Sequence, residues 1–146
     1  MDIGFTGTQE GMTDYQKDFV GFFLDQYRPL SPFEKARHGM CIGADFQFHN
    51  LCKERKIRVV GYPGINKYGS SPKRAECDVD EIEPERFYLE RNELIVGDCD
   101  VLIATPKSHI EESRSGTWFT IRNAREVKRH LFIVLPNGNV LEENRR

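Results

Sequence analysis

Short apolar runs alternate with helix-like segments along the whole chain, and this alternation restricts the possible folds more than any other feature. Strands alternating with helices require crossover connections, which make the strands parallel and cover both faces of the sheet with helices. We therefore expect an α/β fold, a three-layer sandwich with a mainly parallel sheet of about five strands, in a single domain of residues 1–146. The expected strands are residues 2–6, 39–42, 57–62, 100–104 and 131–135.

The segments between these runs carry apolar residues at helical spacing. The first helix is expected from Asp14 to about Tyr27, with Thr13 or Asp14 as its N-cap, and Pro29 and Pro32 interrupt the chain after it. After the last strand we expect a turn, a short hairpin partner at residues 140–141 and a C-terminal tail. The other expected helices cover residues 46–55, 85–97 and 116–128, and Asp45 is the expected N-cap of the first of these. The expected tail covers residues 142–146.

The charge balance argues against several classes of partner. Lys and Arg number 21 and Asp and Glu number 23, which gives a net charge of −2. Because a protein that neutralises many phosphates has a basic excess, nucleic acid is an unlikely partner. No apolar run approaches the roughly 20 residues that span a bilayer, and no leader pattern opens the chain. We expect a cytoplasmic protein that does not bind membranes.

The four cysteines give no sign of a metal centre. Cys41, Cys52, Cys77 and Cys99 form no C-x-x-C pair, and no His lies at ligand spacing from them. Without a secretion signal, we expect reduced and mostly buried thiols. The sequence therefore predicts neither a metal site nor a cofactor.

One long segment has the composition of a functional loop. Residues 65–84 are rich in Gly, Ser, Pro and charge, and so long a stretch without regular structure is unusual inside a domain. We expect a flexible flap that closes over a ligand with Tyr68, Lys73 and Arg74.

Three places combine the end of a strand with the start of a helix, where parallel sheets bind ligands. Residues 6–8 offer two hydroxyls and a glycine whose backbone can approach a ligand closely. Residues 43–45 place two small residues beside a carboxylate. Residues 114–117 offer free backbone amides, hydroxyls and a guanidinium that can bind one anion. Together they predict a nucleotide site made of Thr6, Gly7, Thr8, Gly43, Ala44, Asp45, Arg114, Ser115, Gly116 and Thr117. The chain has neither a P-loop nor a G-x-G-x-x-G sequence.

Four segments carry a recognisable pattern, namely residues 4–7 (GFTG), 38–45 (HGMCIGAD), 88–92 (YLERN) and 114–122 (RSGTWFTIR). Together they resemble the SLOG superfamily, Rossmann-like nucleotide-binding domains that include the Lonely Guy phosphoribohydrolases. The resemblance implies a Rossmann-like nucleotide-binding domain of the small stand-alone type found in bacteria and phages. It also implies a homodimer or higher homo-oligomer, and a ligand-binding role for Arg91.

The Lonely Guy enzymes cleave the N-glycosidic bond of nucleoside monophosphates, with an Arg in M-x-x-R-K and a Glu in P-G-G-x-G-T-x-x-E. Arg91 matches that Arg and residues 116–117 match the G-T, but Asn92 replaces the Lys and Thr120 replaces the Glu. A hydroxyl cannot act as the carboxylate base or charge stabiliser at neutral pH. Glu112, in the loop before the helix, is the reserve candidate for a catalytic carboxylate beside Arg91.

Two functions follow from these observations. The first is a binding module for a nucleotide or an NAD-derived nucleotide of the ADP-ribose type, which by analogy with SLOG domains of defence effectors would sequester a signal in phage–host immunity. The alternative is an enzyme, a nucleoside 5′-monophosphate N-glycosidase. A third role as a nucleic-acid adaptor, as in the DNA-processing SLOG members, fits poorly with a net charge of −2.

Overall fold

The structure is a computed structural model that describes residues 1–27 and 34–145, so the expected break at Pro29 and Pro32 lies outside the described residues. None of the helices in this part of the chain is both long and apolar enough to cross a membrane. In chain order the elements are β1 (Ile3–Gly7), α1 (Asp14–Tyr27), β2 (Lys35–His38), α2 (Ala44–Glu54), β3 (Arg58–Gly61), β4 (Gly64–Ile65), β5 (Glu81–Ile82), β6 (Arg86–Phe87), α3 (Tyr88–Asp98), β7 (Val101–Thr105), α4 (Gly116–Glu126), β8 (His130–Val134) and β9 (Val140–Glu143).

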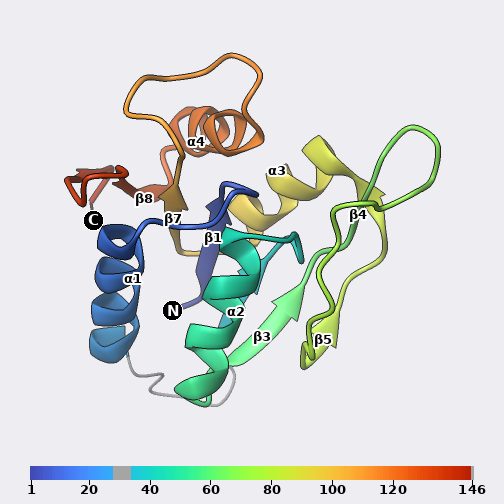
Figure 1. Cartoon of the computed structure of the whole chain (residues 1–146), viewed down its shortest axis with the longest axis horizontal. Helices are drawn as coiled ribbons and strands as arrows, with labels where there is room; N and C mark the ends of the chain where they lie inside the picture. The colour runs from blue at the N-terminus through green and yellow to red at the C-terminus, as the bar shows by residue number, and fades with distance from the viewer. Residues whose placement is uncertain (28–33, 146) are drawn as a thin grey trace.

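A seven-stranded sheet in the order β5-β3-β2-β1-β7-β8-β9 forms the centre of the molecule (Figure 1). Its strands are parallel except for β9, which pairs antiparallel with β8. This confirms the mainly parallel α/β sheet. The hairpin partner expected at residues 140–141 is present as part of β9, and β5 is an additional strand at the opposite edge. The strand β9 includes Glu142 and Glu143, the first two residues of the expected tail.

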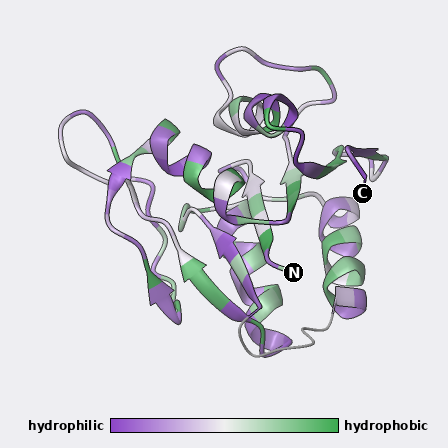
Figure 2. Cartoon of the chain, turned by 180° about the vertical axis from the view of Figure 1, so that it is seen from behind, coloured by the Kyte–Doolittle hydropathy of each residue, from purple (hydrophilic) through white to green (hydrophobic). Residues whose placement is uncertain are grey.

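Side chains that alternate between the two faces of the strands produce two apolar cores. In Figure 2, β3 is green over much of its length, whereas the neighbouring β2, with the sequence KARH, is purple. Under α1 and α2, Phe5 of β1 stacks on Phe48 of α2 with ring centroids 4.3 Å apart. The fully buried residues on this face include Ile3, Val20, Ala36, Val59, Val101 and Ile103. Those on the face of α3 and α4 include Leu102, Ala104, Ile121, Leu131 and Ile133.

The second strand lies earlier in the chain than the sequence predicted. The prediction placed it on the apolar run 39–42, whereas β2 is Lys35–His38. The polar side chains of this strand are satisfied inside the sheet, because Arg37 donates hydrogen bonds to Asp2 at 2.8 and 3.0 Å. The apolar run instead turns, since Met40 has a φ of 57°, which no strand residue adopts.

The starts of two helices show one prediction confirmed and one corrected. Thr13 caps α1 in a reciprocal arrangement, since its hydroxyl accepts from the Gln16 amide at 3.2 Å and Gln16 accepts from the Thr13 amide at 2.9 Å. In contrast, Gly43 is the N-cap of α2 and Asp45 lies inside its first turn. The N-cap prediction for Asp45 was wrong because the helix begins two residues earlier than its apolar face suggests.

The segment of residues 65–84 is joined to the sheet over much of its length. The amides of Ala75, Asp80 and Glu83 donate to the carbonyls of Met40, Val59 and Gly61 at 2.8 to 2.9 Å. Residues 66–70 form a separate turn, whose backbone projects from the molecule beyond β4 (Figure 1). The part of the expected flap that is free of the sheet is therefore this tip.

Candidate functional site

A cleft of about 650 Å³ lies at the carboxyl ends of the parallel strands. After β1 the chain crosses to β2 on one side, and after β7 it crosses to β8 on the other, so the cleft lies at the switch point where such sheets bind ligands. Its volume is typical of small-molecule sites. It is lined by Thr6, Gly7, Thr8, Gln9, Glu10, Cys41, Asp45, Asn66, Pro72, Lys73, Tyr88, Leu89, Arg91, Asn92, Lys107, Glu112, Arg114, Ser115, Gly116 and Thr117.

The loop after β1 forms one wall of the cleft, and Gly7 is required there by close packing. A Cβ atom at Gly7 would lie 2.4 Å from the Thr105 hydroxyl and 2.5 Å from the Ala44 methyl. The Thr8 hydroxyl accepts from the Glu10 amide at 3.2 Å, and the Thr8 amide donates to the Thr105 carbonyl at 3.2 Å. These bonds fix the edge of β1 against β7, the other strand beside the cleft.

The start of α2 contributes a carboxylate to the cleft but not the two residues before it. Gly43 and Ala44 are absent from the lining, because Ala44 is fully buried and its amide donates to the Thr8 carbonyl at 2.9 Å. Gly43 has a φ of 83° and lies against Gln9. The two residues thus shape the wall from behind, and the expectation that they contact a ligand is not supported by this placement.

Asp45 is nearly enclosed although it lines the cleft. Its side chain is 6% exposed, and one oxygen accepts from the Cys41 amide at 3.2 Å. Burial raises the pKa of Asp45 to about 6, against the opposing effect of the Arg91 guanidinium. The carboxyl therefore changes charge close to neutral pH.

Arg91 supplies charge beneath the cleft, and most of its donors are used within the protein. It donates to the carbonyls of Gly39 and Tyr62, and its Nε donates to the Asn92 side chain at 2.7 Å. Its side chain is 5% exposed. Arg91 therefore acts mainly by holding the loop after β2 against α3, while its positive charge remains close to the cleft.

The N-terminus of α4 forms the opposite wall of the cleft. Ser115 is the N-cap and accepts from the Trp118 amide at 3.2 Å. The amides of Gly116 and Thr117 have no partner inside the helix, as is general for the first turn. Arg114 is exposed and, within residues 1–27 and 34–145, no carboxylate lies within ion-pair distance of it. Free amides and an unpaired guanidinium thus meet at one place.

Two residues of the cleft lining each have a buried polar side-chain atom that lacks a partner among the described residues. These atoms are the Tyr88 hydroxyl and one carboxylate oxygen of Glu112. An unsatisfied buried polar atom costs about 1–3 kcal/mol. Both are therefore candidates to bond a ligand.

Thr120, which stands where the Lonely Guy pattern has its Glu, lies outside the cleft lining. It is 1% exposed and its hydroxyl donates to the Gly116 carbonyl at 2.9 Å, within α4. The structure thus brings Glu112, and not Thr120, to the cleft.

Several lining residues were not predicted from sequence. Gln9 and Glu10 follow β1 and Lys107 follows β7, so the rule that singled out their neighbours could have found them. Of the expected flap residues, Lys73 lines the cleft, whereas Arg74 pairs with Glu85 and Tyr68 is 81% exposed.

Comparisons with known proteins identify the fold. No protein-family model and no curated protein matches the chain. The molybdenum cofactor binding protein from the phototrophic bacterium Rippkaea orientalis is similar over 92% of this chain and 76% of its own, with a TM-score of 0.68 and 18% identity. DNA processing protein A from Streptococcus pneumoniae is similar over 90% of this chain and 49% of its own, with a TM-score of 0.60 and 19% identity. DNA processing protein A from Helicobacter pylori is similar over 91% of this chain and 64% of its own, with a TM-score of 0.57 and 17% identity. At these identities the likeness concerns the fold alone, and it agrees with a Rossmann-like α/β fold.

Proposed function

We propose that this protein binds a nucleotide, of the NAD-derived ADP-ribose type, in the cleft between β1, α2 and α4. The observation that carries the proposal is the N-terminus of α4, where free amides and the unpaired Arg114 border a cleft of about 650 Å³. Helix N-termini bind phosphate through their amides and their positive dipole, and a guanidinium adds charge-assisted hydrogen bonds.

The remaining walls suit the sugar and the base of such a ligand. Asp45 carries a carboxylate that can accept from ribose hydroxyls, and Thr6 and Thr8 add hydroxyls on the β1 side. The Tyr88 hydroxyl, which has no partner among the described residues, can bond a further polar group. A cleft with both cationic and acceptor groups favours a ligand with phosphate and hydroxyl groups over a simple anion.

A second unpaired cation supports a ligand with more than one phosphate. Lys73, from the segment before β5, lines the cleft and has no ion pair within the described parts of the chain. Arg114 and Lys73 come from separate segments of the chain, so two phosphate groups can be met by two charges. This favours a diphosphate such as ADP-ribose over a monophosphate.

The biological role proposed on the SLOG resemblance is sequestration of a signalling nucleotide during phage infection. One structural neighbour is named for binding a cofactor and two for DNA processing. The net charge of −2 favours a small molecule over nucleic acid for this chain. The homo-oligomer that the resemblance implies is a separate proposal, which sedimentation of the purified protein tests.

The experiment is to incubate the protein with ADP-ribose, NAD or AMP, remove free ligand, denature the protein and identify what is released. Intact ADP-ribose in stoichiometric amount is the expected result. If no nucleotide is retained, the result contradicts binding. If free base and ribose phosphate are released, the protein hydrolyses the nucleotide.

Glu112 is the observation that favours the second candidate, a nucleoside 5′-monophosphate N-glycosidase. One oxygen of this carboxylate is buried at the cleft without a partner among the described residues. A carboxylate in that position can stabilise an oxocarbenium-like transition state or activate water. Release of free base from AMP by the wild-type protein, and not by Glu112→Gln, would establish this function.

Arg114→Ala is expected to weaken ADP-ribose binding by about 2 kcal/mol, or roughly 30-fold, because a charge-assisted contact to phosphate is lost. Calorimetric titration measures the effect. Arg58→Ala is the matched control, since Arg58 is exposed at the amino end of β3, away from the cleft. Equal affinities of Arg114→Ala and the wild type would show that Arg114 does not contact the ligand.

The tip of the flap is expected to respond to ligand while its anchored part does not. Asn66 lines the cleft, and its side chain accepts from the amides of Tyr68 and Ser70 at 2.9 and 3.1 Å. Saturating ADP-ribose should slow hydrogen exchange of these two amides and leave that of Asp80 unchanged, because Asp80 is already bonded to β3. Unchanged exchange at the tip would contradict a closing flap.

A further inference from the structure

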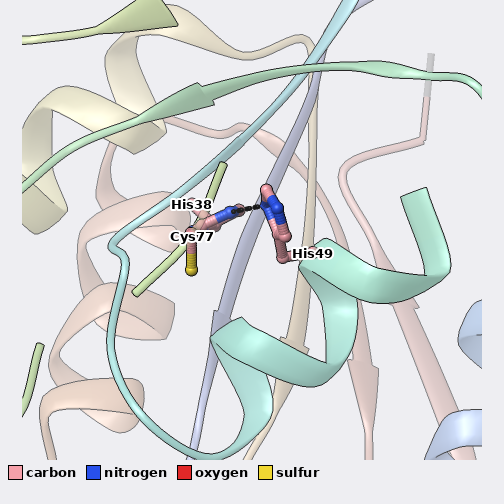
Figure 3. Close-up of side chains that lie close together, drawn as sticks. All are labelled: His38, His49 and Cys77. Carbon is pink, nitrogen blue, oxygen red and sulfur yellow. Dashed lines mark hydrogen bonds between the residues drawn. The ribbon is translucent and has the colours of Figure 1, made fainter. Parts of the chain in front are cut away.

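A second group of chemically capable side chains lies outside the cleft, where three separate segments meet. His38 ends β2, His49 lies in α2, and Cys77 belongs to the segment between β4 and β5. Their donor atoms all lie within 4.8 Å of one another. Both histidines are fully buried and Cys77 is half-buried, so the group is open to solvent only on the side of the thiol. Figure 3 shows His49 projecting from α2 toward His38, with Cys77 beside His38.

The hydrogen bonds of His49 fix which of its nitrogens holds a lone pair. Its Nε2 lies 2.7 Å from the side chain of Asp78, an exposed carboxylate whose oxygens accept hydrogen bonds. The ring proton is therefore on Nε2, and Nδ1 carries a lone pair directed at His38, 3.0 Å away. A carboxylate that orients a histidine through its other nitrogen is the usual support of a metal ligand.

We propose that His38, His49 and Cys77 form a binding site for a zinc ion, with a water molecule as the fourth ligand. Two imidazole nitrogens and a thiolate are a donor set that Zn²⁺ prefers in tetrahedral sites. This ligand set has no short sequence spacing, which is why the cysteine pattern alone predicts no metal.

The geometry requires only small movements. Tetrahedral Zn²⁺ with its ordinary bond lengths places two nitrogens about 3.3 Å apart and a nitrogen about 3.6 Å from sulfur. The two facing histidine nitrogens, 3.0 Å apart, must separate slightly. One nitrogen of each ring lies within 4.8 Å of the sulfur, about an ångström more than the distance between two zinc ligands. Cys77 is the residue best able to move, because it lies in a loop and is half-buried.

One existing contact must give way when the metal binds. The Met40 amide donates to His38 Nδ1 at 2.9 Å, whereas a neutral ring that binds zinc through Nε2 carries its proton on Nδ1. The Met40 amide must then turn away. Because Cys41 follows Met40 and lines the cleft, binding of zinc would also shift the backbone of the cleft wall at Cys41.

The same three side chains offer a complete arrangement without metal. Met40 donates to His38, His38 to His49, and His49 to Asp78, so that every polar atom of the two rings is satisfied. The experiment must therefore separate a zinc site from a hydrogen-bonded chain.

The test is titration of the reduced, chelator-treated protein with Co²⁺, a spectroscopic substitute for Zn²⁺, followed by Zn²⁺. Tetrahedral coordination with one thiolate gives visible cobalt bands and a near-ultraviolet sulfur-to-cobalt band, and one equivalent of Zn²⁺ is expected to abolish both. The Met40 amide resonance should shift at the same point of the titration. Absence of these bands at one equivalent of Co²⁺ would leave the hydrogen-bonded chain and overturn the zinc site.

Variants identify the ligands. Cys77→Ser should lose the sulfur-to-cobalt band and bind at least tenfold more weakly, while Cys99→Ser, which alters a buried thiol in the core beneath α3 and α4, should bind as the wild type does. Asp78→Asn, which alters an exposed side chain and so preserves the fold, should weaken binding about 10- to 100-fold. The same band in Cys77→Ser as in the wild type would contradict the assignment.

Discussion

The stability of the wild-type protein relative to Asp45→Asn is expected to fall by about 3 kcal/mol as the pH rises from about 3 to about 7. Burial raises the pKa of Asp45 from 3.8 to about 6, so the folded chain holds a proton that the unfolded chain releases earlier. Between these two values the folded state binds more protons, and its stability decreases with increasing pH. A shift of about two pKa units corresponds to about 3 kcal/mol.

Urea unfolding of both proteins across this pH range measures the effect. Subtracting the free energy of unfolding of Asp45→Asn from that of the wild type removes the contribution of the other carboxyl groups, which titrate in both proteins. A constant offset from the lost charge beside Arg91 also drops out, because only the change with pH is compared. A difference that stays the same from about pH 3 to pH 7 would contradict the raised pKa.

Gly43→Ala is expected to lower the free energy of unfolding by about 3 kcal/mol or more, because two separate penalties coincide. The residue has a φ of 83° and a ψ of −125°, a conformation nearly restricted to glycine. Its Cβ would also lie 2.2 Å from the carbonyl oxygen of Gln9, a backbone atom that cannot rotate away. Relief of this contact requires the loop after β1 to separate from α2.

Gly69→Ala is the matched control for this substitution. Gly69 has a φ of 75°, but no atom lies within 4 Å of its would-be Cβ, so only the backbone penalty of about 1 kcal/mol is expected. Urea unfolding of both variants measures how much more the substitution costs at Gly43, where the close contact and the glycine-restricted conformation coincide. Equal destabilisation of the two would show that Gly43 is not in close contact with Gln9.

The fold was predictable from sequence because its central strands are apolar on both faces. Residues 101–104 and 131–135 are continuous apolar runs, and they coincide with most of β7 and β8. The second strand was misplaced because β2 is polar in sequence and its charges are satisfied only by distant residues such as Asp2. Such pairing is not visible in local sequence.

The candidate site was predictable where it depends on strand ends and helix starts. Residues 6–8 and 114–117 were found this way, and the structure brings them to one cleft. The exact start of α2 was not predictable, and Gly43 and Ala44, which the sequence analysis places among the ligand contacts, lie outside the cleft lining. His38, His49 and Cys77 are brought together only by the packing of three segments, which no sequence spacing encodes.

The measurement that tests the central claim most directly is an amide NMR titration with ADP-ribose. If the loops after β1 and before α4 hold one ligand, the amides of residues 6–8 and 115–117 will shift together and saturate with a single affinity. Amides at the opposite end of the sheet, such as that of Arg58, will not shift. Shifts confined to other parts of the molecule, or none at saturating ADP-ribose, would contradict nucleotide binding in this cleft.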